Sequence, residues 1–327
     1  MKDRLFYFIF IVLSLLTPSI LIASEEGIEK NLIRMQAKDR ADFIFEQKVA
    51  LVIGLSDYPE NSNIPSLSYA ENDALALEKK LTAFGYRVRI LTNHQATTGA
   101  VLSVIDDLGQ YLTPDKGTFI FYFSGHGFAQ DKDNYLATYE SDMNNLERTG
   151  LSLNRVIDRL QTIGARRHVL LIDACRNDPN TGSKNLNNPR SFKEFDFAEG
   201  TQILFSTKYG GKSYEYSQLG HGVYTYYLLQ GLDGKARRED GMLTFSGLAD
   251  YVSVNVKDYV FRAKKTQLPF VAGERHGVFL IHGQNRQKKR PWYKNPWVWV
   301  GMLSAGSAAA YFNRDRDSDG NHDIQTR

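Results

Sequence analysis

Short apolar runs alternate with longer stretches of helical periodicity from Lys48 to about Gly283. Two runs, Thr118–Ser124 and His168–Ala174, are apolar at almost every consecutive position, which is typical of strands buried on both faces of a sheet. Such runs alternating with helix-like stretches predict an α/β fold with a mostly parallel six-stranded sheet and helices on both faces. The strands are expected at 49–55, 86–92, 118–124, 168–174, 202–207 and 278–282, and the helices at 67–84, 98–112, 153–163, 224–232 and 245–259.

Composition narrows the class of protein. The 327 residues are 42% hydrophobic and 24% charged, as in a folded globular protein. This excludes a disordered tail protein, a collagen-like repeat and a polytopic membrane protein. The 40 Lys+Arg are nearly balanced by 37 Asp+Glu, with a net charge of +3, so we expect no nucleic-acid partner. The single cysteine, Cys175, excludes an intrachain disulfide and a zinc site built from several thiolates.

Two predicted strands end in reactive side chains. In parallel sheets, sites form beyond the carboxyl ends of the strands, where loops present reactive groups. The strand at 118–124 runs into Gly125-His126-Gly127, and the strand at 168–174 runs into Cys175. The two glycines let a substrate backbone approach the histidine closely. We expect a thiol at a strand end to lie outside the apolar interior that would raise its pKa.

A cysteine and a histidine at matching strand ends can act as a nucleophile and its acid–base partner. Cysteine catalysis needs a thiolate, an imidazole that takes the thiol proton and protonates the leaving amine, and donors for the oxyanion. We therefore predict that Cys175 and His126 form a catalytic dyad that needs no metal or cofactor for its chemistry. The alternatives are that Cys175 is a small buried residue and that His126 only completes a turn. His221 opens a helix and can edge the same cleft, without a place at a strand end.

The segments around His126 and Cys175 resemble two conserved motifs, the His and Cys boxes, of a known family. Tyr122-Phe-Ser-Gly-His-Gly127 and Asp173-Ala-Cys-Arg-Asn177 are similar to the His and Cys boxes of caspase-like cysteine peptidases, in particular of bacterial metacaspase, paracaspase and orthocaspase relatives. The resemblance covers about Val49–Gly283 and does not include the tail. Further similar segments are Val52–Tyr58, Ala70–Asp73, His221–Leu229 and Gln267–Pro269.

This resemblance implies the caspase–haemoglobinase fold and hydrolysis of protein or peptide substrates through an acyl-enzyme. It makes Cys175 the nucleophile and His126 the acid–base group, and it assigns the oxyanion hole to the backbone amides of Gly127 and Cys175. In the metacaspase branch an acidic pocket selects Arg or Lys before the scissile bond. The matching positions are Asp73, Ser124 and Asp173.

The chemistry of that pocket is consistent with its residues, because a guanidinium favours carboxylates as charge-assisted acceptors. The alternative is that Asp73 caps or lines a helix face and that Asp173 orients the end of its strand. One departure concerns the rim of the pocket: the box continues Cys-Arg-Asn-Asp here, where metacaspases have Cys-His-Ser-Gly.

A long polar segment, residues 176–204, follows the cysteine and contains Lys184, Arg190 and Lys193. Long irregular segments inside compact domains are usually functional or mobile. We predict that the enzyme cuts itself in this linker after a basic residue, as relatives that mature by processing do.

Two other interpretations stay open. One is a caspase-fold scaffold or regulatory binding module that hydrolyses nothing, against which the intact Cys175 and His126 argue. The other is a flavodoxin-like ligand-binding domain, although Gly54-Leu-Ser-Asp57 after the first strand is not a Gly-rich phosphate loop.

Residues 1–24 have the features of an export signal. Lys2 and Arg4 precede the apolar run Leu5–Ile22, and small residues then precede two glutamates. We therefore expect a periplasmic or otherwise extracytoplasmic protein. The run is long enough that an uncleaved membrane anchor is the alternative. Residues 25–47 are expected to be a helical lead-in to a peptidase domain at 48–283.

The C-terminal region is expected to contact a membrane. A basic linker, residues 284–296, leads into an uncharged segment, residues 297–312, and all three tryptophans lie at this junction. Clustered aromatic residues suit the membrane interface. As a helix the segment would measure roughly 24 Å, less than the ~30 Å of a hydrocarbon core, so a helix packed on a partner is the alternative.

The acidic tail, residues 313–327, has carboxylates at regular intervals. Asp315, Asp317 and Asp319 alternate before Gly320, and Asp323 follows. This spacing is typical of short loops that wrap oxygen ligands around calcium. Calcium is therefore a candidate ligand, and a solvated acidic tail is the alternative.

Overall fold

The structure, a computed structural model, describes residues 38, 40–130, 133–176, 200–273 and 279–283 of the chain. All of these lie in the first of two units, Met1–Gly283, and the second unit, Gln284–Arg327, falls outside the described residues. Also outside lie the predicted export signal and most of the lead-in and of the self-cleavage linker. In the described ranges, no helix is long and apolar enough to cross a membrane.

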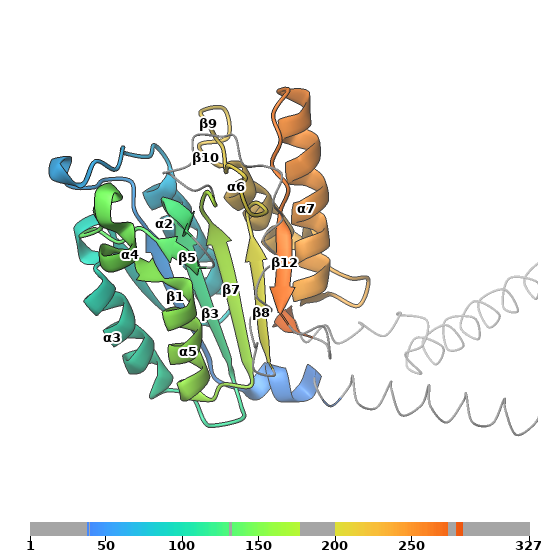
Figure 1. The fold of residues 1–327 in the computed structure, drawn as a ribbon. Helices are drawn as coiled ribbons and strands as arrows, with labels where there is room; N and C mark the ends of the chain where they lie inside the picture. The colour runs from blue at the N-terminus through green and yellow to red at the C-terminus, as the bar shows by residue number, and fades with distance from the viewer. Residues whose placement is uncertain (1–37, 39, 131–132, 177–199, 274–278, 284–327) are drawn as a thin grey trace, which may run out of the picture. The chain divides into compact units, whose positions relative to one another are not determined.

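A six-stranded sheet forms the centre of the fold (Figure 1). Its strand order is β12-β8-β7-β3-β1-β2; neighbours from β8 to β2 pair in parallel, and β12 is antiparallel to β8. The prediction of a mostly parallel sheet is confirmed. The strands are β1 (Lys48–Gly54), β2 (Arg87–Thr92), β3 (Thr118–Ser124), β7 (Arg167–Asp173), β8 (Thr201–Phe205) and β12 (Phe270–Gly273).

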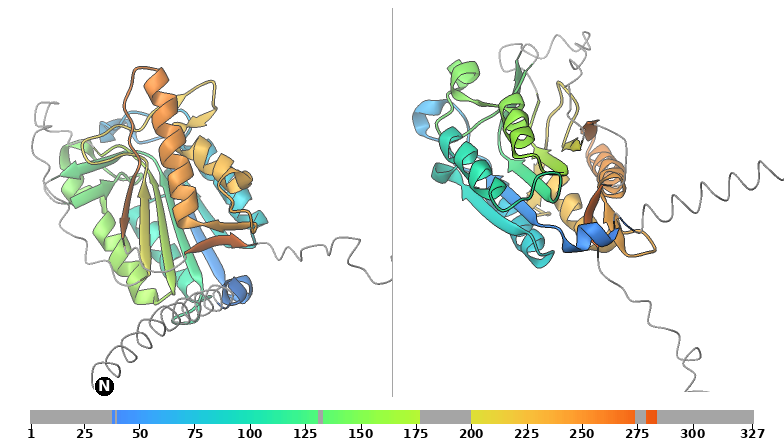
Figure 2. Two further views of the ribbon diagram at one scale, coloured as in Figure 1. Left: turned by 90° about the vertical axis from the view of Figure 1, so that its right-hand side faces the viewer. Right: turned by 90° about the horizontal axis from the view of Figure 1, so that it is seen from below.

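Helices cover both faces of this sheet (Figure 2). One face packs against α3 (Thr98–Gly109) and α5 (Leu153–Ile163), and the other packs against α2 (Ala70–Ala83), α6 (Val223–Gln230) and α7 (Phe245–Arg262). Every residue of β3 and of β7 is buried, which is why these strands are apolar at consecutive positions rather than at alternate ones.

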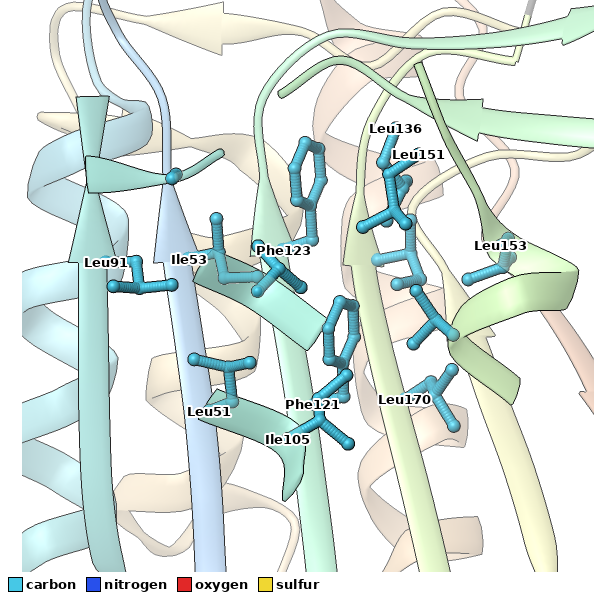
Figure 3. Packing of buried hydrophobic residues seen from close by; sticks show 14 of the residues in the cluster. Leu51, Ile53, Leu91, Ile105, Phe121, Phe123, Leu136, Leu151, Leu153 and Leu170 are labelled. Atoms are coloured by element: carbon cyan, nitrogen blue, oxygen red, sulfur yellow. The ribbon is translucent and has the colours of Figure 1, made fainter. Parts of the chain in front are cut away.

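The core beneath α3 and α5 is drawn in Figure 3. Leu51 and Ile53 of β1 and Phe121 and Phe123 of β3 point to this face, while their neighbours in sequence point to the other. Each such side chain stabilises the fold by roughly 1.5–3 kcal/mol on burial. The interior therefore consists of two apolar layers separated by the sheet, and the polar side chains of the candidate site lie at the ends of the strands.

The sixth strand differs from the prediction. We expected it at 278–282, but the strand beside β8 is β12, and β13 (Leu280–Gly283) pairs instead with β11 (Met242–Thr244) in a separate two-stranded sheet. The reason is that β12 is a four-residue antiparallel edge strand that ends at Gly273, where φ is +114°. An edge strand needs no long buried apolar run, so hydrophobicity alone does not reveal it.

Shorter elements connect the sheet and helices. The helical ones are η1 (Glu60–Ser62), η2 (Asn93–Gln95), η3 (Met143–Asn145), α4 (Leu146–Thr149) and the π-turn η4 (Gly231–Lys235). A three-stranded sheet is formed by β4 (Gly127–Gln130), β5 (Asp133–Leu136) and β6 (Leu151–Ser152), and a hairpin by β9 (Glu215–Tyr216) and β10 (His221–Gly222). In Figure 1, β9 and β10 lie beyond the arrowheads of β7 and β8.

The described end of the lead-in is attached to the amino-terminal edge of the sheet. Residues 40–45 are helical. Glu46 accepts hydrogen bonds from Arg167 at 2.7 and 2.8 Å and from the Thr118 hydroxyl at 2.8 Å. The Glu46 and Arg167 side chains are only 5% and 4% exposed. This buried pair attaches Glu46 to the start of β7, and losing either partner would leave the other charge buried and uncompensated.

Candidate active site

The candidate nucleophile and base follow two strands that are neighbours in the sheet. In the parallel pairing of β3 with β7, Ser124 lies opposite Asp173. His126 comes two residues after Ser124, and Cys175 comes two residues after Asp173. The expectation that the two strand ends are adjacent is confirmed, and the chain leaves both strands at the same edge of the sheet.

A small pocket opens at this edge, with a volume of about 50 Å³. Cys175 and His126 both line it, and so do the three residues matched to the specificity pocket, Asp73, Ser124 and Asp173. The lining residues run from Leu67 to Gly222, so positions up to 155 residues apart contribute to one cavity. The remaining lining residues are Leu67, Gly125, Ser213, Tyr214, Glu215 and Gly222.

His126 is held by hydrogen bonds at both its ring and its backbone. Its Nε2 lies 2.8 Å from the backbone oxygen of Pro65, and its backbone N–H donates to the Tyr58 hydroxyl at 3.1 Å. The ring of Phe128 stacks on it at 6.2 Å between centroids. Burial lowers the pKa of His126, and the hydrogen bond to Pro65 opposes that shift. The imidazole is therefore oriented and held mainly neutral near pH 7.

Cys175 is half-buried, and its sulfur lies beside the segment that leads into β9. The backbone N–H of Ser213 donates to the Cys175 sulfur at 3.4 Å. Burial raises the pKa of Cys175, and the Ser213 hydrogen bond partly opposes that change. The expectation that a strand-end thiol would escape such a rise was wrong, because residues 213–215, distant in sequence, cover the strand end.

Gly127 brings the histidine loop against the cysteine backbone. A Cβ at this position would lie 2.8 Å from the backbone oxygen of Cys175 and 2.7 Å from the Cβ of Ala174. Any side chain would therefore push the two strand-end loops apart. The glycine after the histidine is explained by this close approach as well as by access for substrate.

Asp73 is a buried carboxylate with several donors. Its side chain is 1% exposed, His221 Nδ1 lies 2.7 Å from its Oδ1, and the Ser124 hydroxyl donates to its Oδ2 at 3.3 Å. The Gly222 N–H also lies 3.3 Å from both of its oxygens. Burial raises the pKa of Asp73 from 3.8 to about 7, although the hydrogen bond from His221 opposes this.

The hydrogen-bond partners of the Asp173 carboxylate in the described part of the chain are neutral hydroxyl groups. Ser213 donates to its Oδ1 and Thr225 to its Oδ2, each at 2.7 Å. Burial raises the pKa of Asp173, and the two hydroxyl hydrogen bonds oppose that rise. These neutral donors do not balance the negative charge of the ionised carboxylate, which a cation in the pocket would do.

The sequence did not identify the segment 213–222 as part of the site, apart from His221 at the cleft edge. Ser213 contacts the sulfur, Glu215 lines the pocket, and His221 binds Asp73. Ser213 lies in an irregular segment and Glu215 begins the two-residue strand β9, and neither is surrounded by a hydrophobic periodicity that would indicate burial. His221 gave a usable signal, since it begins a segment that resembles the family.

Among the described residues, no group of three or more His, Cys, Asp or Glu side chains is arranged to hold a metal ion. Asp315, Asp317, Asp319 and Asp323 lie outside the described residues.

The fold is α/β with a cysteine and a histidine at neighbouring strand ends, and comparison identifies the family. The model of the caspase domain family, Peptidase_C14, matches residues 47–295, so the chain belongs to the caspase-domain peptidase family. It is 27% identical over 222 residues to a protein named as a probable protease from a Desulfuromonadales bacterium. That match covers 58% of this chain and 26% of the relative, so the chain spans about a quarter of the length of that curated protein.

The fold is also found in a solved structure. The crystal structure of protein GSU0716 from Geobacter sulfurreducens superimposes with a TM-score of 0.52 at 16% sequence identity. The match covers 70% of this chain and 95% of the other. At this identity the similarity concerns the fold alone.

Proposed function

We propose that this protein is a cysteine endopeptidase that cleaves peptide bonds after Arg or Lys, with Cys175 as nucleophile and His126 as acid–base partner. One observation carries the proposal: the thiol, the imidazole and the carboxylates of Asp73 and Asp173 line the same pocket. A nucleophile, a proton acceptor and a charged recognition site are thereby within reach of one bound peptide.

The hydrogen bond to Pro65 supports a definite role for each nitrogen of His126. A carbonyl oxygen only accepts, so Nε2 carries the proton and Nδ1 is the basic nitrogen. Burial shifts the pKa of Cys175 up and that of His126 down. These shifts favour a neutral thiol and imidazole at rest, so the proton moves when substrate is bound.

In the proposed reaction, Nδ1 of His126 takes the thiol proton as the Cys175 sulfur attacks the carbonyl carbon of the scissile bond. The C–N bond then breaks as His126 gives that proton to the leaving amine, and a thioester remains. Water attacks the thioester and gives a proton to His126, which returns it to the departing sulfur. The backbone amides of Gly127 and Cys175 are the proposed oxyanion donors, and the close packing at Gly127 supports their proximity.

Charge supports the preference for basic residues. Among the described residues, the pocket lining contains the carboxylates of Asp73, Asp173 and Glu215 and no lysine or arginine. A substrate Asp would face like charges, whereas a guanidinium would donate charge-assisted hydrogen bonds to the carboxylates of Asp73 and Asp173. Ligand pockets usually measure about 300 Å³ or more, so we expect the 50 Å³ pocket to widen when a basic side chain enters it.

Short fluorogenic peptides test the function directly. We expect wild-type protein to release the reporter from peptides ending in Arg or Lys, and the Cys175→Ala variant to release none. Turnover after Asp alone would contradict the pocket and leave the dyad standing. No turnover of any peptide would favour the scaffold or binding-module interpretation.

We also propose self-processing within residues 176–204, after Lys184, Arg190 or Lys193. The support is the position of this basic, polar segment directly after the nucleophile. Mass spectrometry of purified wild-type and Cys175→Ala protein tests it. Fragments that end in a basic residue and occur only in wild type are expected, and identical fragment patterns would contradict the proposal.

Calcium activation, export and membrane contact are proposals that rest on the sequence of the termini. Calcium added to the peptide assay should raise turnover if Asp315, Asp317, Asp319 and Asp323 bind it, and Asn at these four positions should remove the effect. Cell fractionation should recover the protein outside the cytoplasm in the membrane fraction. Deletion of residues 297–312 should release it into the soluble extracytoplasmic fraction.

A further inference from the structure

The carboxylate of Glu215 binds the chain just before α2. Its Oε2 accepts a hydrogen bond from the Ser68 N–H at 3.0 Å, and its Oε1 accepts one from the Tyr69 N–H at 3.1 Å. Tyr69 is the N-cap of α2 and makes no side-chain cap hydrogen bond of its own. A carboxylate from a hairpin about 150 residues away thus satisfies amide groups at the start of this helix, where negative charge is favoured.

The segment held in this way is the one that orients the candidate base. Pro65, whose backbone oxygen lies 2.8 Å from His126 Nε2, comes three residues before Ser68. A second attachment lies between them, the Leu67 N–H bonded to the Ser56 oxygen at 2.8 Å. Glu215 therefore fixes one end of the short stretch that carries the Pro65 carbonyl.

The same hairpin also touches the recognition carboxylates. Glu215 lies opposite Gly222 in the pairing of β9 with β10, and the Gly222 N–H points to Asp73. Although Glu215 lines the pocket, both of its oxygens are engaged by backbone amides. This geometry suits a side chain that positions the site better than one that binds a substrate cation.

We propose that Glu215 is a positioning residue: through Ser68 and Tyr69 it holds the 65–69 segment so that the Pro65 carbonyl fixes the orientation of the His126 ring. The inference rests on the proposed peptidase function for its kinetic consequence only. A misplaced base slows the chemical step while leaving substrate binding nearly unchanged, and displacements of about 1 Å cost up to roughly a hundredfold in rate.

Kinetics of Glu215→Ala and Glu215→Gln test this role. We expect kcat on an Arg peptide to fall by about tenfold to a hundredfold in Glu215→Ala, less in Glu215→Gln, which keeps one acceptor oxygen, and KM to change by less than about twofold in both. The matched control is Glu140→Gln, which removes a carboxylate bonded to the Thr98 N–H at the start of α3, away from the pocket. A rise in KM with kcat unchanged would overturn the proposal and make Glu215 a substrate-binding carboxylate.

A second measurement needs no turnover. In the Cys175→Ala background, NMR titration of the His126 ring reports its pKa, which the Pro65 hydrogen bond raises. Loss of positioning should lower that pKa more in Glu215→Ala than in Glu215→Gln, with no change in Glu140→Gln. Equal shifts of the His126 pKa in the two Glu215 variants would mean that only the charge of Glu215 matters. No shift in either variant would mean that the contacts of Glu215 with Ser68 and Tyr69 do not affect His126. Either result overturns the inference. The NMR titration tests the positioning role of Glu215 even if the protein hydrolyses no peptide.

Discussion

His221 and Asp73 form a hydrogen-bonded pair at the candidate recognition site, with Nδ1 of the imidazole 2.7 Å from Oδ1 of the carboxylate. Burial raises the pKa of Asp73 to about 7, and the His221 hydrogen bond keeps it from rising further. The imidazole therefore helps the carboxylate to stay ionised at neutral pH. Since only the ionised form attracts a guanidinium, the proposed specificity for Arg and Lys predicts that His221 affects the affinity for basic substrates.

Replacing His221 by Ala should weaken binding of Arg peptides at pH 7. Without the imidazole the pKa of Asp73 rises, so a larger fraction of this side chain is protonated. A hydrogen bond to a charged group is worth about 1.5–3 kcal/mol, so we expect KM for an Arg peptide to rise roughly tenfold or more. The rise should shrink at higher pH.

The control for this variant is His94→Ala, which changes an exposed histidine that is not part of the pocket. A peptide ending in citrulline, the uncharged analogue of Arg, supplies the second readout. If KM for citrulline and Arg peptides rose equally in His221→Ala, the residue would act on the shape of the pocket and not on its charge.

Asp73 should make the stability of the protein depend on pH. Its folded-state pKa of about 7 lies above its ordinary value of 3.8, so between these values the folded state binds the proton more tightly than the unfolded state. The free energy of unfolding should therefore fall as pH rises from about 4 to about 7, by at most about 1.4 kcal/mol per pKa unit. Asp73→Asn should remove this part of the decline.

Urea unfolding of the two proteins across this pH range measures the difference. Asp158→Asn, at an exposed position of α5, controls for loss of one surface carboxylate. Parallel pH profiles for wild type and Asp73→Asn would contradict the assignment of a raised pKa to Asp73.

A methyl group at position 222 should block the recognition site without changing the backbone. Gly222 has φ −59° and ψ 142°, which alanine adopts freely. Its Cβ would lie 2.9 Å from Asp173 Oδ2 and 3.1 Å from Asp73 Oδ2, so it would crowd both carboxylates. We expect Gly222→Ala to raise KM for Arg peptides.

Alkylation of Cys175 by iodoacetamide should be unchanged in this variant, because the small reagent does not need the carboxylates. Gly99→Ala is the matched control, since a Cβ there meets no atom within 4 Å. An unaltered KM in Gly222→Ala would show that the substrate side chain does not lie between Asp73 and Asp173.

The sequence predicted the features that depend on continuous patterns of hydrophobicity. Buried parallel strands leave long apolar runs, so β3 was expected with its observed bounds and β7 within one residue. Helix α5 was expected at its observed bounds because its buried residues follow helical spacing and Gly164 ends it in the left-handed region. The strand-end locations of His126 and Cys175 followed from these elements.

Features that depend on contacts between distant segments could not be predicted in the same way. The edge strand β12 is too short and too exposed for its pattern to reveal it. The burial of the Cys175 thiol results from residues 213–215, which nothing in the local sequence connects to β7. The hydrogen bonds of Glu215 with Ser68 and Tyr69 form only because the hairpin folds back onto the start of α2. The contact of His221 with Asp73 has the same origin.

The central claim is that the Cys175 thiol and the His126 imidazole act together on a peptide with a basic residue. A peptidyl acyloxymethyl ketone ending in Arg, followed by intact-protein mass spectrometry, tests it most directly, because the protein contains one cysteine. The account predicts one adduct per wild-type molecule, none in Cys175→Ala, and labelling slower by about a hundredfold or more in His126→Ala. Labelling of wild type and His126→Ala at equal rates, with both thiols accessible to iodoacetamide, would contradict it.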